Sequence, residues 1–154
     1  MEVIKHGIIK ISGDCIIDRL ITDAIITNDE NNISSKVLSL WDTGATRTCI
    51  HPRLLNKLGL ENQHIGYTNL SGYFGHGEQQ LFHAKIDFYD KISFYGDVAV
   101  MPYETEEFDL VIGTDIISKG NFMLINFEDK TELCFECPPK FGLNSILSGL
   151  KTKE

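Results

Sequence analysis

The sequence predicts a single, mostly β domain. Its 154 residues are enough for one domain with a real hydrophobic core. Isoleucine-rich segments recur along the chain and are separated by short polar or glycine-containing turns, which is the pattern of strands. No long amphipathic helix, tandem repeat or low-complexity tract is present. We therefore expect an all-β fold with one or two short helices.

The first part of the chain is expected to contain strands and then one short helix. The expected strands are the isoleucine-rich or apolar segments 4–11, 15–27, 37–41 and 46–50. A polar loop, Asn28 to Asn32, separates two of them. Residues 51–60 predict the helix, because Pro52 suits a first helical turn and Gly59 suits a C-terminal cap.

The second part repeats this pattern more faintly. Phe108 to Ile112 is an apolar strand that runs into Gly113, and a second short helix is expected after it, closed by Gly120. Further strands are expected at residues 67–70, 78–89, 92–101, 122–127 and 132–136. The last two are predicted to form a hairpin around Glu128-Asp129-Lys130.

Asp42 is the candidate catalytic residue. The apolar run Val37 to Trp41 delivers this aspartate into a turn of small residues, Thr43-Gly44-Ala45, and such a turn presents a carboxylate for chemistry. Asp-Thr-Gly is also an ordinary turn sequence, since Asp and Gly both favour turns. The context decides: a short helix follows, a second strand-glycine-helix element comes about seventy residues later, and a glycine-rich hairpin lies between them.

Together these segments resemble the retropepsin-like aspartic proteases, over roughly residues 20 to 135. The matching motifs are Asp42-Thr43-Gly44-Ala45, Val111-Ile112-Gly113 and a hairpin at about Thr68 to Phe82. Thr114 follows the second glycine where retroviral members usually have an arginine, which is more similar to the retrotransposon and cellular branch. The resemblance implies a single-lobe, closed β-barrel with one or two short helices and a β-hairpin flap.

One aspartate in a chain of this length implies a homodimer. The chain contains eleven aspartates, and only Asp42 is followed by Thr-Gly or Ser-Gly. Hydrolysis by this route needs one carboxylate that accepts a proton from water and a second, protonated carboxyl that donates to the scissile carbonyl oxygen. Two such groups held close together share one proton. We therefore expect Asp42 of each protomer to form the pair, with no metal and no cofactor.

The resemblance also implies roles for the neighbours of Asp42. Gly44 allows close backbone approach and donates an N–H towards the carboxylate, while the Thr43 hydroxyl bonds across the dimer. Ala45 is small enough to line the substrate cleft. Val111, Ile112 and Gly113 support the active-site loop from below. Trp41 is expected in the core, because it points to the opposite face from Asp42.

The glycine-rich hairpin is the expected flap. Gly72 and Gly75 lower the conformational barrier at its tip, and Tyr73 and Phe74 offer apolar area to hold an extended peptide. The alternative is an ordinary glycine-rich hairpin. The glycine order does not fit a dinucleotide-binding fingerprint, and no βαβ unit surrounds it.

We expect three parts in the chain. Residues 1–19 form a strand-like N-terminal extension, residues 20–137 the protease domain, and residues 138–154 a tail that can carry a short helix. Either terminal part has three possible roles: it joins the dimer contact, covers the cleft or stays free.

Cysteines and histidines give weaker signals. Cys134 and Cys137 have the spacing of a zinc knuckle or redox pair, but Cys15 and Cys49 are single and distant, so buried reduced thiols are the better interpretation. No histidine has the spacing of paired metal ligands. One further hypothesis pairs Arg47 with Asp115.

Net charge limits the partners. The chain carries a formal charge of −8, which argues against nucleic acid or an anionic membrane. Its acidic cluster either favours basic residues in a substrate or is a solvated loop; it comprises Glu104, Glu106, Glu107 and Asp109. No apolar span reaches membrane length and the N-terminus lacks a signal-peptide core, so we expect a cytoplasmic protein.

The leading hypothesis is an aspartic endopeptidase, active as a homodimer on a peptide or protein substrate. Its main alternative is a catalytically idle dimer of the same fold that binds peptides or scaffolds an assembly. A zinc or thiol redox module built on Cys134 and Cys137 is a third possibility.

Overall fold

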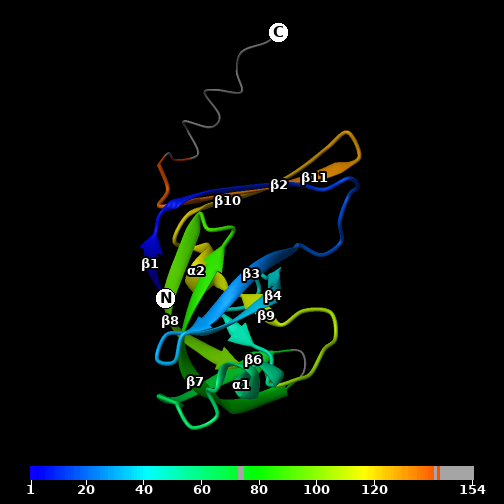
Figure 1. Ribbon diagram of the computed structural model, residues 1–154. Helices are drawn as coiled ribbons and strands as arrows, with labels where there is room; N and C mark the ends of the chain where they lie inside the picture. The colour runs from blue at the N-terminus through cyan, green and yellow to red at the C-terminus, as the bar shows by residue number, and fades with distance from the viewer. Residues whose placement is uncertain (73–74, 141, 143–154) are drawn as a thin grey trace.

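The computed structural model describes residues 1–72, 75–140 and 142, with the side chains of 71–76 excepted. Within these residues the chain forms eleven strands and two short helices (Figure 1). The strands are β1 (Glu2–Lys5), β2 (Gly7–Ser12), β3 (Ile21–Asn28), β4 (Ile33–Trp41), β5 (Cys49–Ile50), β6 (Gly66–Gly72), β7 (Gly75–Phe88), β8 (Ile92–Val100), β9 (Leu110–Ile112), β10 (Asn121–Phe127) and β11 (Lys130–Cys137). The helices are α1 (Arg53–Leu58) and α2 (Thr114–Ile117).

Six strands close into a mixed barrel, as the sequence predicts. Their order is β8-β5-β9-β4-β3-β7, and the additional pairing of β7 with β8 closes the ring. Two of the contacts, β4 with β9 and β5 with β8, are parallel. β1 adds to the outside of β8, and β6 adds to β7 as the second arm of a hairpin.

A separate three-stranded sheet, in the order β10-β11-β2, lies across one end of the barrel (Figure 1). Trp41 joins the two layers: its ring lies 5.2 Å from that of Phe88 in the barrel, and 5.6 and 5.1 Å from those of Phe122 and Phe135 in the sheet. Its Nε1–H donates to the Thr22 hydroxyl at 2.9 Å. The side chain is 6% exposed, so the prediction that Trp41 belongs to the core is confirmed.

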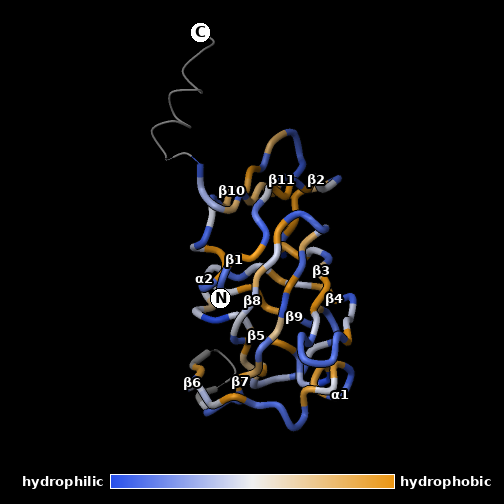
Figure 2. Tube along the Cα trace, turned by 60° about the vertical axis from the view of Figure 1, so that its left-hand side comes forward, coloured by the Kyte–Doolittle hydropathy of each residue, from blue (hydrophilic) through white to orange (hydrophobic). Residues whose placement is uncertain are grey.

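Hydrophobic residues follow the strands, while most connecting loops are hydrophilic (Figure 2). Alternation along β3 and β4 gives each strand one buried and one open face. β9 is different, because all three of its residues are buried. Such a strand has neighbours on both sides and no open face.

The predicted strands are correct in most segments, with three differences. The strand expected over 4–11 is interrupted at His6, so β1 and β2 enter different sheets. Residues 15–20 are not a strand, because this segment crosses from the three-stranded sheet to the barrel and the Cys15 carbonyl accepts from the Thr131 N–H. Residues 46–48 also stay outside a strand. Polar groups of Thr46 and Thr48 bond instead to Thr114 and Asp115, at the start of α2.

Both predicted helices are present. α1 begins after Pro52 and ends at Gly59, whose φ of 67° is the left-handed conformation that glycine adopts without strain. The role predicted for Gly120 is wrong, because α2 ends at Ile117 and its C-cap residue is Ser118. Gly120 instead lies so close to β11 that a Cβ would sit 2.3 Å from the Glu136 carbonyl oxygen.

Replacing Gly120 with alanine should lower the free energy of unfolding by about 1–3 kcal/mol, because backbone must move to admit the methyl group. Gly66→Ala is the matched control, since no heavy atom lies within 4 Å of a Cβ built there. Urea denaturation of both variants measures the effect. Equal midpoints for the two would contradict this account of Gly120.

Candidate active site

Asp42 lies directly after β4, where this strand runs parallel to β9. The register pairs Trp41 with Ile112, and the Asp42 N–H donates to the Ile112 carbonyl at 3.0 Å. The loop after β4 is therefore held by a strand about seventy residues further along the chain. The Thr114 N–H adds a second bond at 2.8 Å, to the Ala45 carbonyl.

The turn after Asp42 holds its carboxylate. The Gly44 N–H donates to Oδ1 at 2.8 Å, and the Ala45 N–H donates to the Asp42 carbonyl at 3.2 Å. A Cβ at position 44 would lie 3.1 Å from the same Oδ1, so a side chain there would crowd this contact. Asp42 is half-buried, while Thr43 and Gly44 are exposed. The carboxylate is thus fixed by backbone and still open to solvent.

β9 forms the base of the site. It lies between β4 and β5, with Val111 opposite both Leu40 and Cys49. Gly113 follows it, and a Cβ there would lie 2.5 Å from the Arg47 carbonyl carbon. This close approach explains why the two loops can cross only where a residue without a side chain is present.

Thr48 connects these two loops and is fully buried. Its N–H and hydroxyl both donate to Oδ1 of Asp115, at 2.9 and 2.7 Å. Its hydroxyl oxygen accepts from the Gly113 N–H at 3.2 Å. Asp115 therefore has Thr48 as its partner, whereas our hypothesis paired it with Arg47.

The hairpin of β6 and β7 faces an apolar cluster beside Asp42. Its strands pair up to Gly72 and Gly75, and the predicted contact residues Tyr73 and Phe74 lie outside the described residues. The buried members of the cluster are Cys49, Ala99, Met101, Phe108 and Val111. Packed against them are Leu40, Ala45, Leu70, Leu81 and Tyr103. The active-site loop and both hairpin arms therefore share one apolar surface.

Burial and nearby acidic groups shift two pKa values here. The pKa of the Cys49 thiol is raised from 9.0 to about 12, first by burial and then by the negative charge of Asp115, while the positive charge of Arg47 lowers it. The pKa of Tyr103 is also raised, first by burial and then by the negative charges of Cys49 and Asp42. Tyr103 therefore lies within electrostatic range of the candidate catalytic carboxylate.

Two arginines pair with three members of the acidic cluster in segment 101–109. Arg53 donates Nε–H to Asp109 at 2.9 Å and Nη1–H to Glu106 at 3.2 Å. Arg19 pairs with Glu107. A preference for basic substrate residues based on the whole cluster is therefore less favoured than the sequence alone allows.

The cysteines do not assemble into a centre. Cys137 is buried and its thiol donates to the Lys119 carbonyl at 3.2 Å, whereas Cys134 is half-buried on the same strand. All four thiols are free. In the described part of the chain, no group of three or more His, Cys, Asp or Glu residues is placed to hold a metal ion.

No family model matches the sequence, and no curated protein matches it. Solved structures do. A retropepsin-like aspartic protease from Rickettsia conorii superposes with a TM-score of 0.57 at 16% identity, over 89% of this chain and 98% of that one. The chain has the retropepsin-like fold. 

Two other matches to this chain are EIAV protease with the inhibitor HBY-793 and the retroviral protease-like domain of Ddi1 from Leishmania major. Their TM-scores are 0.49 and 0.47, at 19% and 15% identity. The match to EIAV protease covers 66% of this chain and 86% of the EIAV chain. The match to the Ddi1 domain covers 82% of this chain and 100% of the Ddi1 domain. With identities this low, we use the likeness for the fold alone.

In this retropepsin-like fold, the sequence missed some neighbours of Asp42. Asp42 bonds to Ile112, and Ala45 bonds to Thr114, which directly follows Gly113. Thr48 and Tyr103 were not expected there. The position of Thr48, six residues after Asp42, gives no signal of the contact it makes with a residue 67 positions away.

Valine at position 48 should lower the free energy of unfolding by about 1–3 kcal/mol, because it keeps the shape but leaves the buried Gly113 N–H without its acceptor. Thr48→Ser keeps the hydroxyl and serves as the control. Guanidinium denaturation compares the two variants. If Thr48→Val is as stable as Thr48→Ser, the hydroxyl does not connect the loops in the way we describe.

Cys49 should resist alkylation by iodoacetamide at pH 8, while exposed Cys15 reacts quickly. Because the pKa of Cys49 is raised in the folded protein, the neutral thiol stabilises the folded state. This stabilisation is complete below about pH 9 and is lost as the pH rises towards 12. Mass spectrometry of the labelled peptides measures the alkylation rates of Cys49 and Cys15, with the denatured protein as reference. Similar rates for the two thiols in the folded protein would contradict the burial of Cys49.

No helix in the described residues is both long and apolar enough to cross a membrane.

Proposed function

We propose that this protein is an aspartic endopeptidase, active as a homodimer in which water is activated between Asp42 of each protomer. One observation carries the proposal: a single carboxylate lies at the end of β4, held by the Gly44 N–H and supported by β9, and it remains open to solvent. The retropepsin-like fold supports protease chemistry at the level of the fold.

In this proposal the dyad shares one proton. One Asp42 carboxylate takes a proton from water, and the carboxyl of its mate donates to the carbonyl oxygen of the scissile peptide bond. The Gly44 N–H keeps each carboxylate in its position during this exchange. Exposed Thr43 is free to bond across the dimer, and Ala45 lines the cleft.

The hairpin of β6 and β7 is proposed as the flap. Leu70 and Leu81 on its arms pack against the same apolar cluster as Ala45, which supports a substrate position between the hairpin and the active-site loop. Gly72, Tyr73, Phe74 and Gly75 are proposed to contact the substrate at the tip. A bound peptide would there lie in a water-poor setting, which strengthens interactions with the dyad.

The proposed partners are a second copy of the chain and a peptide or protein substrate. Neither nucleic acid nor a membrane is a proposed partner, because the chain carries a charge of −8. A cytoplasmic location and the division into residues 1–19, 20–137 and 138–154 are proposed on the sequence grounds given above.

The second candidate is a dimer that binds peptides without turnover. The apolar cluster beside Asp42 would serve such a module equally well. The two candidates differ in chemistry alone, so activity measurements and binding measurements together separate them.

Replacing Asp42 with asparagine should lower the rate of peptide cleavage by a factor of about 10³ or more. The asparagine amide cannot share a proton as the two carboxyl groups of the dyad do. The assay is digestion of a diverse peptide library between pH 4 and 7, at several protein concentrations. A statine-type transition-state analogue should inhibit the parent protein.

Specific activity should fall on dilution below the dimer dissociation constant, since each protomer supplies one carboxyl. Cleavage that survives in Asp42→Asn, or that stays proportional to protein on dilution, would rule out the shared dyad. Tight peptide binding without any cleavage would favour the idle module.

A further inference from the structure

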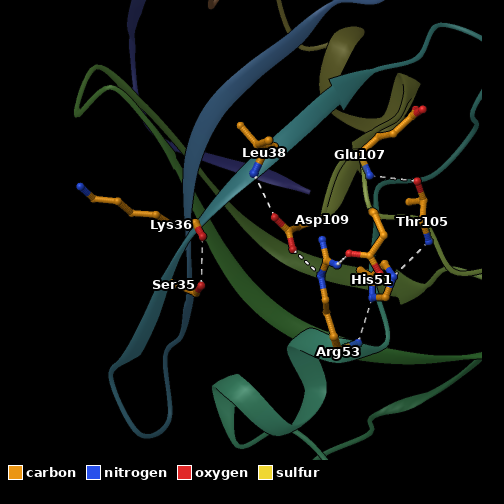
Figure 3. Close-up of polar contacts among 9 residues, drawn as sticks. Ser35, Lys36, Leu38, His51, Arg53, Thr105, Glu107 and Asp109 are labelled. Carbon is orange, nitrogen blue, oxygen red and sulfur yellow. Dashed lines mark hydrogen bonds and ion pairs between the residues drawn. The ribbon is translucent and has the colours of Figure 1, made fainter.

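His51 occupies a buried position between α1 and the segment of residues 101–109. It is 5% exposed and directly follows β5. Its Nδ1 lies 3.0 Å from the Arg53 N–H nitrogen, and its Nε2 lies 3.2 Å from that of Thr105 (Figure 3). Both ring nitrogens therefore face backbone donors.

A neutral imidazole accepts at one nitrogen and carries a hydrogen on the other. The two contacts of His51 are consequently alternatives, one towards α1 and one towards segment 101–109. The contact with Arg53 is local, because the two residues are neighbours in the chain. The contact with Thr105 joins positions 54 apart, and Thr105 lies in the middle of the segment.

Segment 101–109 is held firmly at its two ends. The Met101 N–H donates to the Ile50 carbonyl at 2.8 Å, and the Asp109 N–H donates to the Leu38 carbonyl at 2.8 Å. The His51 N–H donates to the Asp109 carbonyl at 2.7 Å. Between these ends, Thr105 contacts the ring of His51 and accepts the Glu107 N–H at 3.2 Å.

The same segment carries Tyr103 to the active site. Tyr103 packs against the same buried apolar cluster as Ala45 of the active-site loop and Leu70 and Leu81 of the hairpin arms. The effect of the Asp42 charge on its pKa agrees with this position. Only Glu104 separates Tyr103 from Thr105 along the chain, so the contact at Thr105 lies next to the residue that packs against the apolar cluster.

Arg53 holds the segment independently of the His51 ring. Its guanidinium binds Asp109 and Glu106. Figure 3 shows Arg53 and Asp109 meeting between α1 and β4. The loss of the ring should therefore displace the middle of the segment locally. It should not release the whole segment.

We propose that His51 is a positioning residue of the substrate cleft, which holds Tyr103 against the active-site loop through the contact of Nε2 with the Thr105 N–H. Tyr103 then contacts the bound peptide from the side of segment 101–109. The role of Tyr103 in substrate binding rests on the proposed protease function. The contact between His51 and Thr105 does not depend on that function.

Two conservative substitutions separate the alternative contacts. His51→Gln places an amide oxygen near the position of Nε2 and preserves an acceptor for Thr105. His51→Asn places one near Nδ1 and preserves the acceptor for Arg53 alone. His51→Ala removes both. His6→Gln is the matched control, because His6 is exposed and lies between β1 and β2.

The first measurement is hydrogen exchange at the Thr105 amide, read by NMR in the full chain. We expect exchange in His51→Asn and His51→Ala to be faster by about fivefold or more, as for the loss of one hydrogen bond, and exchange in His51→Gln and His6→Gln to stay within about twofold of the parent. Parent-like exchange in His51→Asn would overturn the proposal.

The second measurement is the affinity for a statine-type peptide analogue. His51→Asn should bind it about fivefold more weakly than His51→Gln, although both fold. Equal affinities, combined with a changed Thr105 exchange rate, would show that the contact exists but does not position the cleft, and would overturn the proposal. 

The two proposals fail differently. If the parent protein neither cleaves peptides nor binds the analogue, the protease function fails, and the proposed role of His51 in substrate binding fails with it. If the parent binds and cleaves while His51→Asn matches it in exchange and affinity, the inference about His51 fails alone.

Discussion

The three-residue strand β9 is the constraint on which the site depends. It is buried between β4 and β5, and its Ile112 carbonyl accepts the N–H of Asp42. An unpaired carbonyl at this depth would cost free energy, so the loop after β4 cannot move without breaking a buried bond. Thr48 adds a side-chain connection between the same loops, through Asp115 and Gly113. Backbone pairing therefore sets the position of the carboxylate, and the side chains nearby secure it.

The second determinant is the packing of Trp41. Because it precedes Asp42 on β4, its ring points away from the site and into the contact between the barrel and the three-stranded sheet. At the end of β4, Trp41 therefore packs in the core, and the next residue, Asp42, lies in the solvent-facing site. The hydrogen bond from its Nε1 to Thr22 satisfies the polar atom of this buried ring. Stability and site geometry are consequently coupled at adjacent positions.

Sequence patterns predicted the fold well, and they singled out two loops that the structure brings together. Alternation and turn residues identified most strands, and Asp42 with Gly113 identified the crossing loops. They could not predict that residues 15–20 leave the strand conformation, because isoleucine content is the same whether a segment pairs or crosses between sheets. His51 and Tyr103 were missed for a similar reason. Their contacts join positions about fifty or more residues apart, and no local pattern encodes such a distance.

The pairing of β4 with β9 also has a consequence for the order of folding. Asp42 receives its backbone partner only after the chain has been synthesised as far as residue 112, and closing so long a loop precedes any gain from the contact. Local hairpins such as β3 with β4 and β7 with β8 can form earlier. The carboxylate therefore reaches its final environment late, when most of the barrel is already assembled. An N-terminal fragment that stops before β9 would contain the complete Asp-Thr-Gly motif but would lack the Ile112 carbonyl that binds the Asp42 N–H.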